Sequence, residues 1–215
     1  MKIIIFTNLK GGVGKSTLCS LFATYMVEQG HPVAVMDADV QQSIVRHRER
    51  DLRAYNLPVL WETKPLTLAD PSRIEEIMRK LKQLPYDVII DCPGNIQDPR
   101  LGHIFASADI AVVPIRYDSD SLDATRLFCN VLSKQSRAEV FFIPNSVALV
   151  EERKEEIRQE RDNAICQLKG FGRVVPRIKQ TSVVKRYCTL DSLSYLQRNA
   201  VKYAFEPILE SIKKR

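Results

Sequence analysis

The chain carries a ten-residue glycine-rich run near its beginning, and this run constrains the fold more than any other feature. Residues 8–17 read NLKGGVGKST. They follow an apolar stretch, residues 2–7, that reads as a buried strand, and they overlap the start of residues 16–29, which read as a helix ended by Gly30. Glycine adopts backbone angles closed to other residues, so successive N–H groups of such a loop can curl around phosphate oxygens. Strand, loop and helix in this order predict a phosphate-binding loop.

Each part of this loop has a chemical reason to bind a nucleoside triphosphate together with Mg2+. Lys15 brings positive charge to the phosphates, and the Ser16 hydroxyl is suited to Mg2+. Ser16 and Thr17 also begin the predicted helix, where unpaired N–H groups and the helix dipole favour an anion. The predicted nucleotide-binding residues of the loop are Gly11, Gly12, Val13, Gly14, Lys15, Ser16 and Thr17.

Aspartates follow two further predicted strands. Asp37 and Asp39 come after the apolar residues 32–36, and Asp91 ends the apolar residues 86–91. In an open α/β sheet, ligands bind at the carboxyl ends of parallel strands, and residues two apart on an extended chain point to one side. Asp91 is therefore expected to hold Mg2+ through water beside Ser16. An Asp-x-Asp turn taken alone more often caps a helix, and its position after the second strand is what favours a catalytic role.

The loop departs from the general motif at one position, and the departure points to a subfamily. Leu9 stands five residues before Gly14, where the general motif has glycine, and Lys10 follows it. The residues from Lys10 to Ser16 resemble the deviant phosphate-binding loop of the ParA/MinD ATPases. This resemblance implies that Lys10 reaches across an ATP-bridged dimer to the nucleotide of the partner subunit. The alternative is that Lys10 is an ordinary solvated lysine.

A second segment is similar to the same family. Residues 37–42 read DADVQQ and match the family's D-x-D-x-Q segment. The similarity implies that Asp39 orients the attacking water and helps to organise Mg2+, with Asp37 behind it in the outer coordination shell. The catalytic residues expected from the resemblance are therefore Lys10, Lys15 and Asp39. The expected metal-binding set is Ser16, Asp37, Asp39 and Asp91.

Two later apolar segments bear on which base is bound. Residues 138–145 end at Asn145, and Pro176 lies near the end of residues 173–178. In ParA-like proteins such positions contact adenine, and a guanine-specific protein would be expected to carry an N-K-x-D segment. Residues 145–148 read NSVA instead, so ATP is favoured over GTP. The alternative is that both residues are ordinary loop residues at strand ends.

The remaining pattern predicts the fold class. The chain has 215 residues, near the size of one large α/β domain, and strand-like and helix-like patterns alternate throughout. One such helix follows a predicted capping box formed by Ser72 and Glu75. We therefore expect a single domain over residues 1–215, with the fold of a P-loop NTPase: a mainly parallel, twisted sheet with helices on both faces. No leader segment and no apolar stretch approaching the roughly 20 residues of a membrane span is visible, so a cytoplasmic protein is expected.

The net charge of +6 favours an anionic macromolecule as a partner, either DNA or a membrane surface. Residues 46–53 alternate basic and acidic side chains and read as a solvated helix face. A second group is denser in positive charge and is expected to contact DNA phosphates. Its members are Arg173, Arg177, Lys179, Lys185 and Arg186.

The resemblance runs over residues 1–193 and is greatest to the short ParA partition ATPases. It implies an ATP-dependent homodimer that binds DNA without sequence preference, associates with the nucleoid, and hydrolyses ATP slowly until a centromere-bound partner protein stimulates it. Residues 37–44 and 189–193 also look like ParA-type proteins carried on conjugative elements of Bacteroides-like bacteria. That narrower resemblance implies a role in DNA transfer with a relaxosome-type partner.

Two other function classes are open. A MinD-like positioning ATPase would dock on lipid through residues 200–212, although Pro207 and two glutamates oppose an amphipathic membrane helix there. A metabolic P-loop ligase would use the same loop to activate a small molecule.

Overall fold

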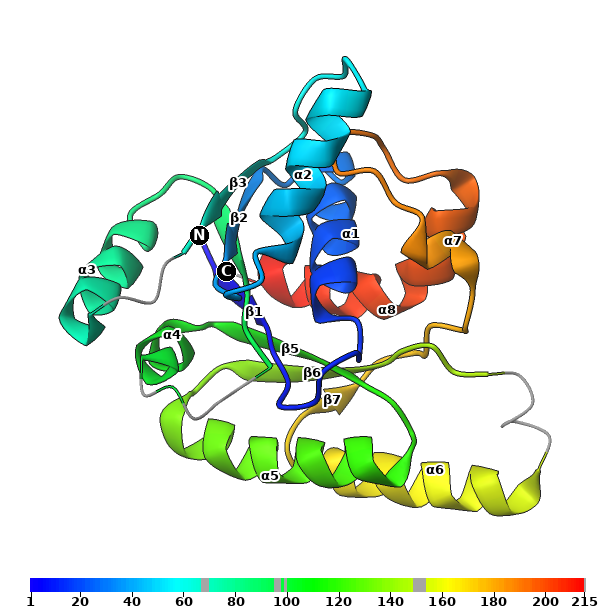
Figure 1. The fold of residues 1–215 in the computed structure, drawn as a ribbon. Coiled ribbons are helices and arrows are strands. Elements are labelled where there is room, and N and C mark those ends of the chain that lie inside the picture. Colours follow the sequence, from blue (N-terminus) through cyan, green and yellow to red (C-terminus); the bar gives the residue numbers. More distant parts are fainter. Residues whose placement is uncertain (67–69, 95–97, 99, 149–153, 215) are drawn as a thin grey trace.

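Seven parallel strands form one twisted sheet in the order β3-β2-β4-β1-β5-β6-β7 (Figure 1). The computed structural model describes residues 1–66, 70–94, 98, 100–148 and 154–214. All strand pairs among these residues run parallel, which confirms the expected parallel α/β architecture. The strands are β1 (Ile3–Phe6), β2 (Val33–Asp37), β3 (Glu62–Pro65), β4 (Asp87–Asp91), β5 (Ile110–Ile115), β6 (Glu139–Pro144) and β7 (Arg173–Val174).

The central strands were predictable because strands buried on both faces are continuously apolar. β1, β4 and β5 are completely buried. The edges differ from expectation. β3 has an exposed, polar sequence and gives no strand signal, while β7 covers only two residues of the predicted 173–178.

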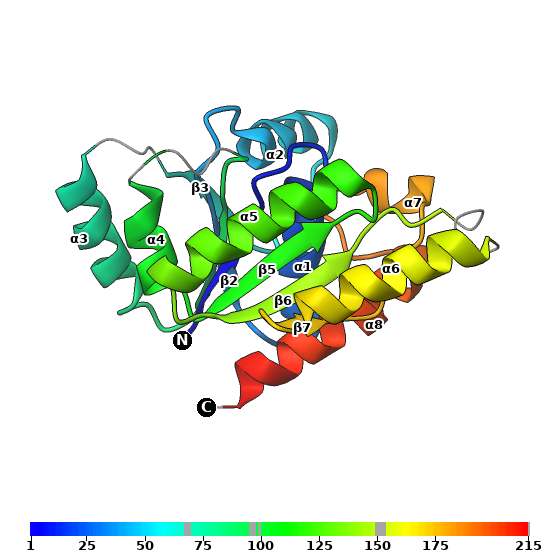
Figure 2. The same ribbon diagram turned by 90° about the horizontal axis from the view of Figure 1, so that it is seen from below.

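Helices cover both faces of the sheet, as expected (Figures 1 and 2). One face carries α1 (Lys15–Glu28), α2 (Ser43–Ala54), α7 (Ser182–Lys185) and α8 (Tyr195–Lys213); the other carries α3 (Pro71–Leu81), α4 (Leu101–Ser107), α5 (Ser119–Gln135) and α6 (Glu155–Leu168). Alternation along β1 divides the apolar core accordingly, because Ile4 and Phe6 belong to the first face and Ile3 and Ile5 to the second.

The predicted capping box at Ser72 is wrong. α3 begins at Pro71, and its N-cap is Asp70, whose side chain accepts a hydrogen bond from the Ser72 backbone N–H at 2.8 Å. A carboxylate two residues earlier thus satisfies the donor that the helix start exposes, and Ser72 lies inside the first turn.

The apolar spacing of α8, considered above as a membrane-docking face, packs inside the protein. Phe205 is fully buried, with its ring centroid 5.0 Å from that of Phe22 and 5.6 Å from that of Tyr25, both on α1. The helix continues through Pro207 to Lys213. No helix among the described residues is long and apolar enough to cross a membrane.

The basic run of α2 is only partly a solvated face. Arg48 is buried and donates to the Thr189 hydroxyl at 2.9 Å, to the Thr189 carbonyl at 3.0 Å and to the Trp61 carbonyl at 2.8 Å. Asp51 accepts from the backbone N–H and the hydroxyl of Thr189, each at 2.7 Å. We call this set of Arg48, Asp51, Trp61 and Thr189 the α2 clasp. It fixes α2 to the segment between α7 and α8.

The packing of α8 gives a stability prediction. Phe205→Ala empties a buried ring site between α8 and α1, so we expect the free energy of unfolding to fall by about 3–5 kcal/mol in denaturant titration. Tyr203→Ala on the same helix is the control, because Tyr203 is 61% exposed and its truncation should cost far less. Equal losses in the two variants would contradict the packing described.

Candidate functional site

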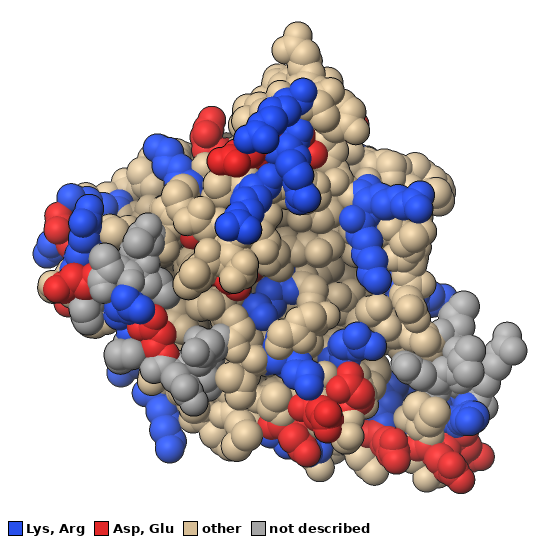
Figure 3. All heavy atoms as spheres, viewed as in Figure 1, with Lys and Arg blue, Asp and Glu red and all other residues tan. Residues whose placement is uncertain are grey.

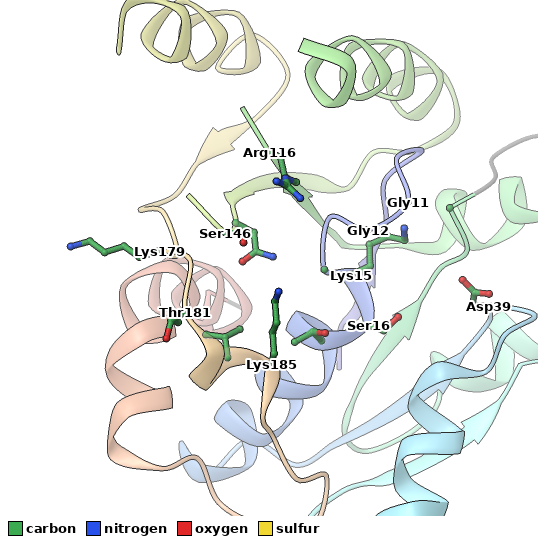
Figure 4. A pocket seen from close by; sticks show the side chains of 15 residues that line it. Gly11, Gly12, Lys15, Ser16, Asp39, Arg116, Ser146, Lys179, Thr181 and Lys185 are labelled. Atoms are coloured by element: carbon green, nitrogen blue, oxygen red, sulfur yellow. The ribbon is translucent and has the colours of Figure 1, made fainter. Parts of the chain in front are cut away.

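A cavity of about 590 Å³ lies at the carboxyl ends of the central strands, over the start of α1 (Figure 4). It brings together much of the glycine loop with Asp39 and Asn145, which are more than 20 and 120 residues further along the chain. The described residues that line it are Gly11, Gly12, Gly14, Lys15, Ser16, Thr17, Asp39, Gly94, Arg116, Asn145, Ser146, Lys179, Thr181, Val184 and Lys185.

The loop backbone has the shape that a phosphate-binding loop needs. Gly12 and Gly14 have φ angles of 76° and 95°, a region that side chains rarely adopt, and α1 starts directly after Gly14. The first N–H groups of α1 have no helical partner, so they are available to an anion in the cavity. Loop and helix together fit the phosphates of a nucleotide.

Two asparagine side chains hold the loop in place. Asn8 donates to the Pro114 carbonyl at 2.8 Å and to the Thr125 hydroxyl at 3.1 Å, which ties the start of the loop to β5 and α5. Asn145 donates to the Val13 carbonyl at 2.9 Å. Its Nδ2 atom lies 2.4 Å from the position that a Cβ on Gly14 would occupy, so the loop and the end of β6 fit closely at a glycine. Asn145 therefore has a structural bond to the loop besides its predicted contact with adenine.

Lys15 lies deep in the cavity. Its side chain is largely buried, and its Nζ donates to the Lys10 carbonyl at 3.3 Å. Burial lowers the pKa of Lys15, and the negative charges of Asp91 and Asp39 oppose that shift. A Cβ on Gly94 would lie 3.4 Å from Nζ, so the ammonium occupies a narrow space between the loop and the end of β4.

Asp91 is a buried carboxylate without a hydrogen bond. It is 0% exposed, and among the described residues no hydrogen bond of ordinary geometry reaches either carboxylate oxygen. Burial raises its pKa to about 7, while the nearby Ser16 hydroxyl and the Lys15 ammonium lower it. Such an unsatisfied carboxylate beside a hydroxyl fits a hard cation such as Mg2+, which proteins usually hold through one or two carboxylates and the substrate's phosphates.

Asp37 lies next to Asp91 in the sheet register, but its carboxylate is already occupied. It accepts from the backbone N–H groups of Asp39 at 3.2 Å, Ile44 at 2.9 Å and Val45 at 3.3 Å. These bonds lower its pKa, and burial, the larger effect, raises it. The carboxylate thus caps the first turn of α2, and an outer-shell role toward a metal stays a prediction.

Asp39 is half-buried at the cavity wall, on the side where Ser16 lies (Figure 4). Its Oδ1 atom accepts from the Gln41 backbone N–H at 2.9 Å. Gln42, between this turn and α2, has a left-handed φ of 47°, a strained conformation for a non-glycine residue. The turn thus holds Asp39 at the entrance of α2 with its second carboxylate oxygen facing no described donor.

The structure also places site residues that the sequence did not suggest. Arg116 and Ser146 follow β5 and β6, and Lys185 reaches into the cavity from α7 (Figure 4). Lys179 and Lys185, expected on a DNA surface, both line this cavity. Their position depends on a loop path that no local pattern encodes, although Thr181 is a typical N-cap residue and caps α7 by accepting from the Val183 backbone N–H.

Two predicted site residues lie away from the cavity wall. Pro176 is exposed after β7, outside the described lining residues, and Lys10 is likewise outside that set. An adenine contact from Pro176 stays a prediction. The role of Lys10 in a partner subunit's site likewise stays a prediction.

A protein-family model decides the classification. Residues 4–189 match the CobQ/CobB/MinD/ParA nucleotide binding domain. The chain belongs to this family. Its sheet and its glycine-loop site, described above, agree with membership, and the resemblance found in residues 10–16 is confirmed at the family level.

Individual relatives of this ParA/MinD-family chain are distant. It is 26% identical over 176 residues to the septum site-determining protein MinD of Buchnera aphidicola, covering 66% of this chain and 63% of that protein. It is 26% identical over 128 residues to the protein ParA of Rhizobium radiobacter, covering 58% and 52%. The chain therefore spans less than two thirds of the length of these curated relatives.

Solved structures agree in fold over nearly the whole chain. A plasmid partition protein of Borrelia burgdorferi B31 bound to AMPPNP matches with a TM-score of 0.71 at 20% identity, covering 100% of this chain and 99% of that one. The apo McdA of Cyanothece matches with a TM-score of 0.77 at 16% identity, covering 99% of each chain. A cobyrinic acid a,c-diamide synthase of Mycobacterium smegmatis, with ADP and magnesium, matches at 0.73 and 17% identity, covering 100% and 96%. At these identities the likeness shows the fold.

The buried Asp91 gives a pH prediction for the protein free of metal and nucleotide. Its folded pKa of about 7 exceeds its ordinary value of 3.8, so the folded state holds a proton that the unfolded state has released. The stability that the Asp91 carboxyl group contributes is therefore fully present below pH 3.8, and it is lost as the pH rises from there through about 7. We expect the thermal midpoint of Asp91→Asn, measured against wild type, to rise between pH 5 and pH 8. The exposed Asp191→Asn is the control, and a pH-independent difference for Asp91→Asn would contradict the assignment.

Proposed function

We propose that this chain is an ATP hydrolase that uses Mg2+ and works as one domain. The observation that carries the proposal is the pair formed by Lys15, buried in the glycine loop, and Asp91, a fully buried carboxylate beside the Ser16 hydroxyl. A phosphate-binding lysine and a metal-binding carboxylate at adjacent strand ends are two of the parts that phosphoryl transfer needs. Mg2+ held by Ser16 and Asp91, when bound, would supply positive charge to the phosphates.

The chain's own residues would perform the rest of the chemistry. Lys15 and the N–H groups of Gly11 to Ser16 bind the phosphates and neutralise the charge that develops on them. Asp39 orients the attacking water, because it is the carboxylate that lines the cavity and has an oxygen free of described donors. Asn145 is placed to contact the adenine, and no guanine-recognition segment follows it.

The proposed active form is an ATP-bridged homodimer. Lys10 lies in the glycine loop, is partly exposed and is not among the described residues that line its own cavity, and we propose that its ammonium contacts the nucleotide of a second copy. The backbone carbonyl of the same residue holds Lys15 within the subunit. One residue would thus serve its own site through its backbone and its partner's site through its side chain.

We propose DNA maintenance as the biological role. The support is the net charge of +6, the likeness in fold to a plasmid partition protein and the relationship to ParA. The dimer would bind DNA without sequence preference, lie on the nucleoid with ATP, and hydrolyse ATP slowly until a protein at a centromere-like or relaxosome-type site stimulates it. Partition and conjugative DNA transfer are the two settings of this one activity.

Two alternatives make different predictions. A MinD-like ATPase would bind anionic liposomes with ATP; the burial of the α8 apolar side chains in the core speaks against docking through that helix. A metabolic ligase, as in the diamide synthase that shares the fold, would turn over ATP rapidly with a small acid and would ignore DNA.

Lys10→Ala tests the dimer. The variant keeps the carbonyl that binds Lys15, so we expect ATP affinity within about threefold of wild type. We expect ATP-driven dimerisation, measured by light scattering after size exclusion, to be lost. Lys82→Ala, which changes an exposed lysine at the end of α3, is the matched control. A Lys10→Ala protein that still dimerises with ATP would contradict the proposed ATP-bridged homodimer.

The Asp39→Ala variant tests two points: whether Asp39 orients the attacking water, and whether the ATP-bound protein binds DNA or a membrane. We expect ATP turnover to fall about 100-fold or more while ATP binding persists, so that the ATP-bound dimer accumulates. This trapped protein should bind nonspecific duplex DNA only with ATP and Mg2+, and the binding should weaken steeply with salt. Unchanged turnover would refute the role of Asp39. Binding to anionic liposomes and not to DNA would make a membrane, instead of DNA, the binding partner of the ATP-bound protein.

A further inference from the structure

The solvent face of α2 carries a regular stripe of arginines. Arg46, Arg50 and Arg53 are spaced four and three residues apart, so they lie along one side of the helix, and all three are exposed. We call these three residues the α2 arginine stripe. The same spacing on the opposite side gives Ile44, Arg48 and Asp51, which are buried. Arg48 therefore lies on the buried side of the helix, and the three arginines of the stripe lie on its exposed side.

The arginine stripe is only weakly neutralised within the chain. Glu49 lies 3.9 Å from the Arg53 guanidinium, and both side chains are more than half exposed. An exposed pair at such a distance contributes little, and salt screens it. Most of the positive charge of the stripe thus remains available to an external anion.

The face of the molecule that bears the stripe is divided by charge. Figure 3 shows mostly basic side chains over α2 and α7, with a few acidic ones beside α2, and acidic side chains mixed with basic ones over α5 and α6. The acidic side includes Asp118, Asp120, Glu155 and Glu156. A polyanion on this face therefore finds more uncompensated positive charge over α2 than over α5 and α6, where acidic and basic side chains are mixed.

α2 is a rigid support for these arginines, and it is held from two directions. Asp37 accepts from the backbone N–H groups of Ile44 and Val45 in its first turn. The α2 clasp binds its middle through Arg48 and Asp51 to Thr189. A helix fixed in this way loses little backbone freedom when a ligand binds, so only the ordering of the arginine side chains offsets its contacts.

We infer that the α2 arginine stripe is the surface that binds the DNA backbone, an inference that rests on the proposed DNA-binding function. Seven residues of helix span roughly 10 Å, which is about three phosphate steps of one strand along the DNA axis. The guanidinium groups can thus each meet a phosphate without reading bases. The sequence-based expectation placed DNA on the group of Arg173, Arg177, Lys179, Lys185 and Arg186, but the Lys185 side chain of that group points into the nucleotide cavity (Figure 4).

The test compares two double variants with equal loss of charge. Arg50→Ala with Arg53→Ala removes two residues of the stripe, and Arg73→Ala with Arg79→Ala removes two exposed arginines of α3, on the other face of the sheet. Both are made in the Asp39→Ala background with ATP and Mg2+. Binding to a duplex of mixed sequence is followed by fluorescence anisotropy over a salt series, with anionic vesicles measured in parallel.

We expect the α2 variant to bind DNA about tenfold or more weaker, with the slope of log affinity against log salt reduced by about 2, and the α3 variant to stay within about threefold. Both should bind ATP as the parent does. Equal losses in the two variants, or none in either, overturn the inference while the proposed function stands. A parent that binds no DNA overturns both, and a parent that binds vesicles instead assigns the stripe to a membrane.

Discussion

The parallel register of β2, β4 and β1 is the constraint on which the site depends. Asp37, Asp91 and Phe6 are direct neighbours across three strands, and the glycine loop starts two residues after β1 ends. Because all strands run the same way, their carboxyl ends meet at one edge, and groups from distant parts of the chain converge there. A single antiparallel strand in the centre would carry its polar end to the opposite edge.

Burial then gives these groups their chemical character. Asp91 and Lys15 lie close together in an environment where an isolated charge is costly, so each raises the affinity of the site for an ion of opposite sign. The Asp37 carboxylate is buried as well, and the three backbone hydrogen bonds that it accepts offset the cost of burying its charge. Adjacent aspartates in one sheet register therefore have different uses: one supports α2, and the other is left for a ligand.

Sequence patterns predicted the elements whose signal is local. Continuous apolar runs located β1, β2 and β4, and the glycine spacing together with Lys10 was enough to indicate the family. The polar edge strand β3 and the burial of Arg48 escaped prediction, since both depend on partners far along the chain. The same holds for Arg116 and Lys185, whose place at the cavity is decided by where loops end in space.

The α2 clasp has a consequence for the order in which the protein folds. Arg48 and Thr189 are 141 residues apart, so α2 cannot reach its final packing until Thr189 has been synthesised. Contacts of such long separation form late because closing the intervening loop is entropically costly. Before that, the guanidinium of Arg48 and the carboxylate of Asp51 lack the hydrogen-bond partner that Thr189 gives them in the folded protein. α2 is thus fixed in place only when the segment around Thr189 has packed against it, so a partner that needs a rigid α2 can bind only late in folding.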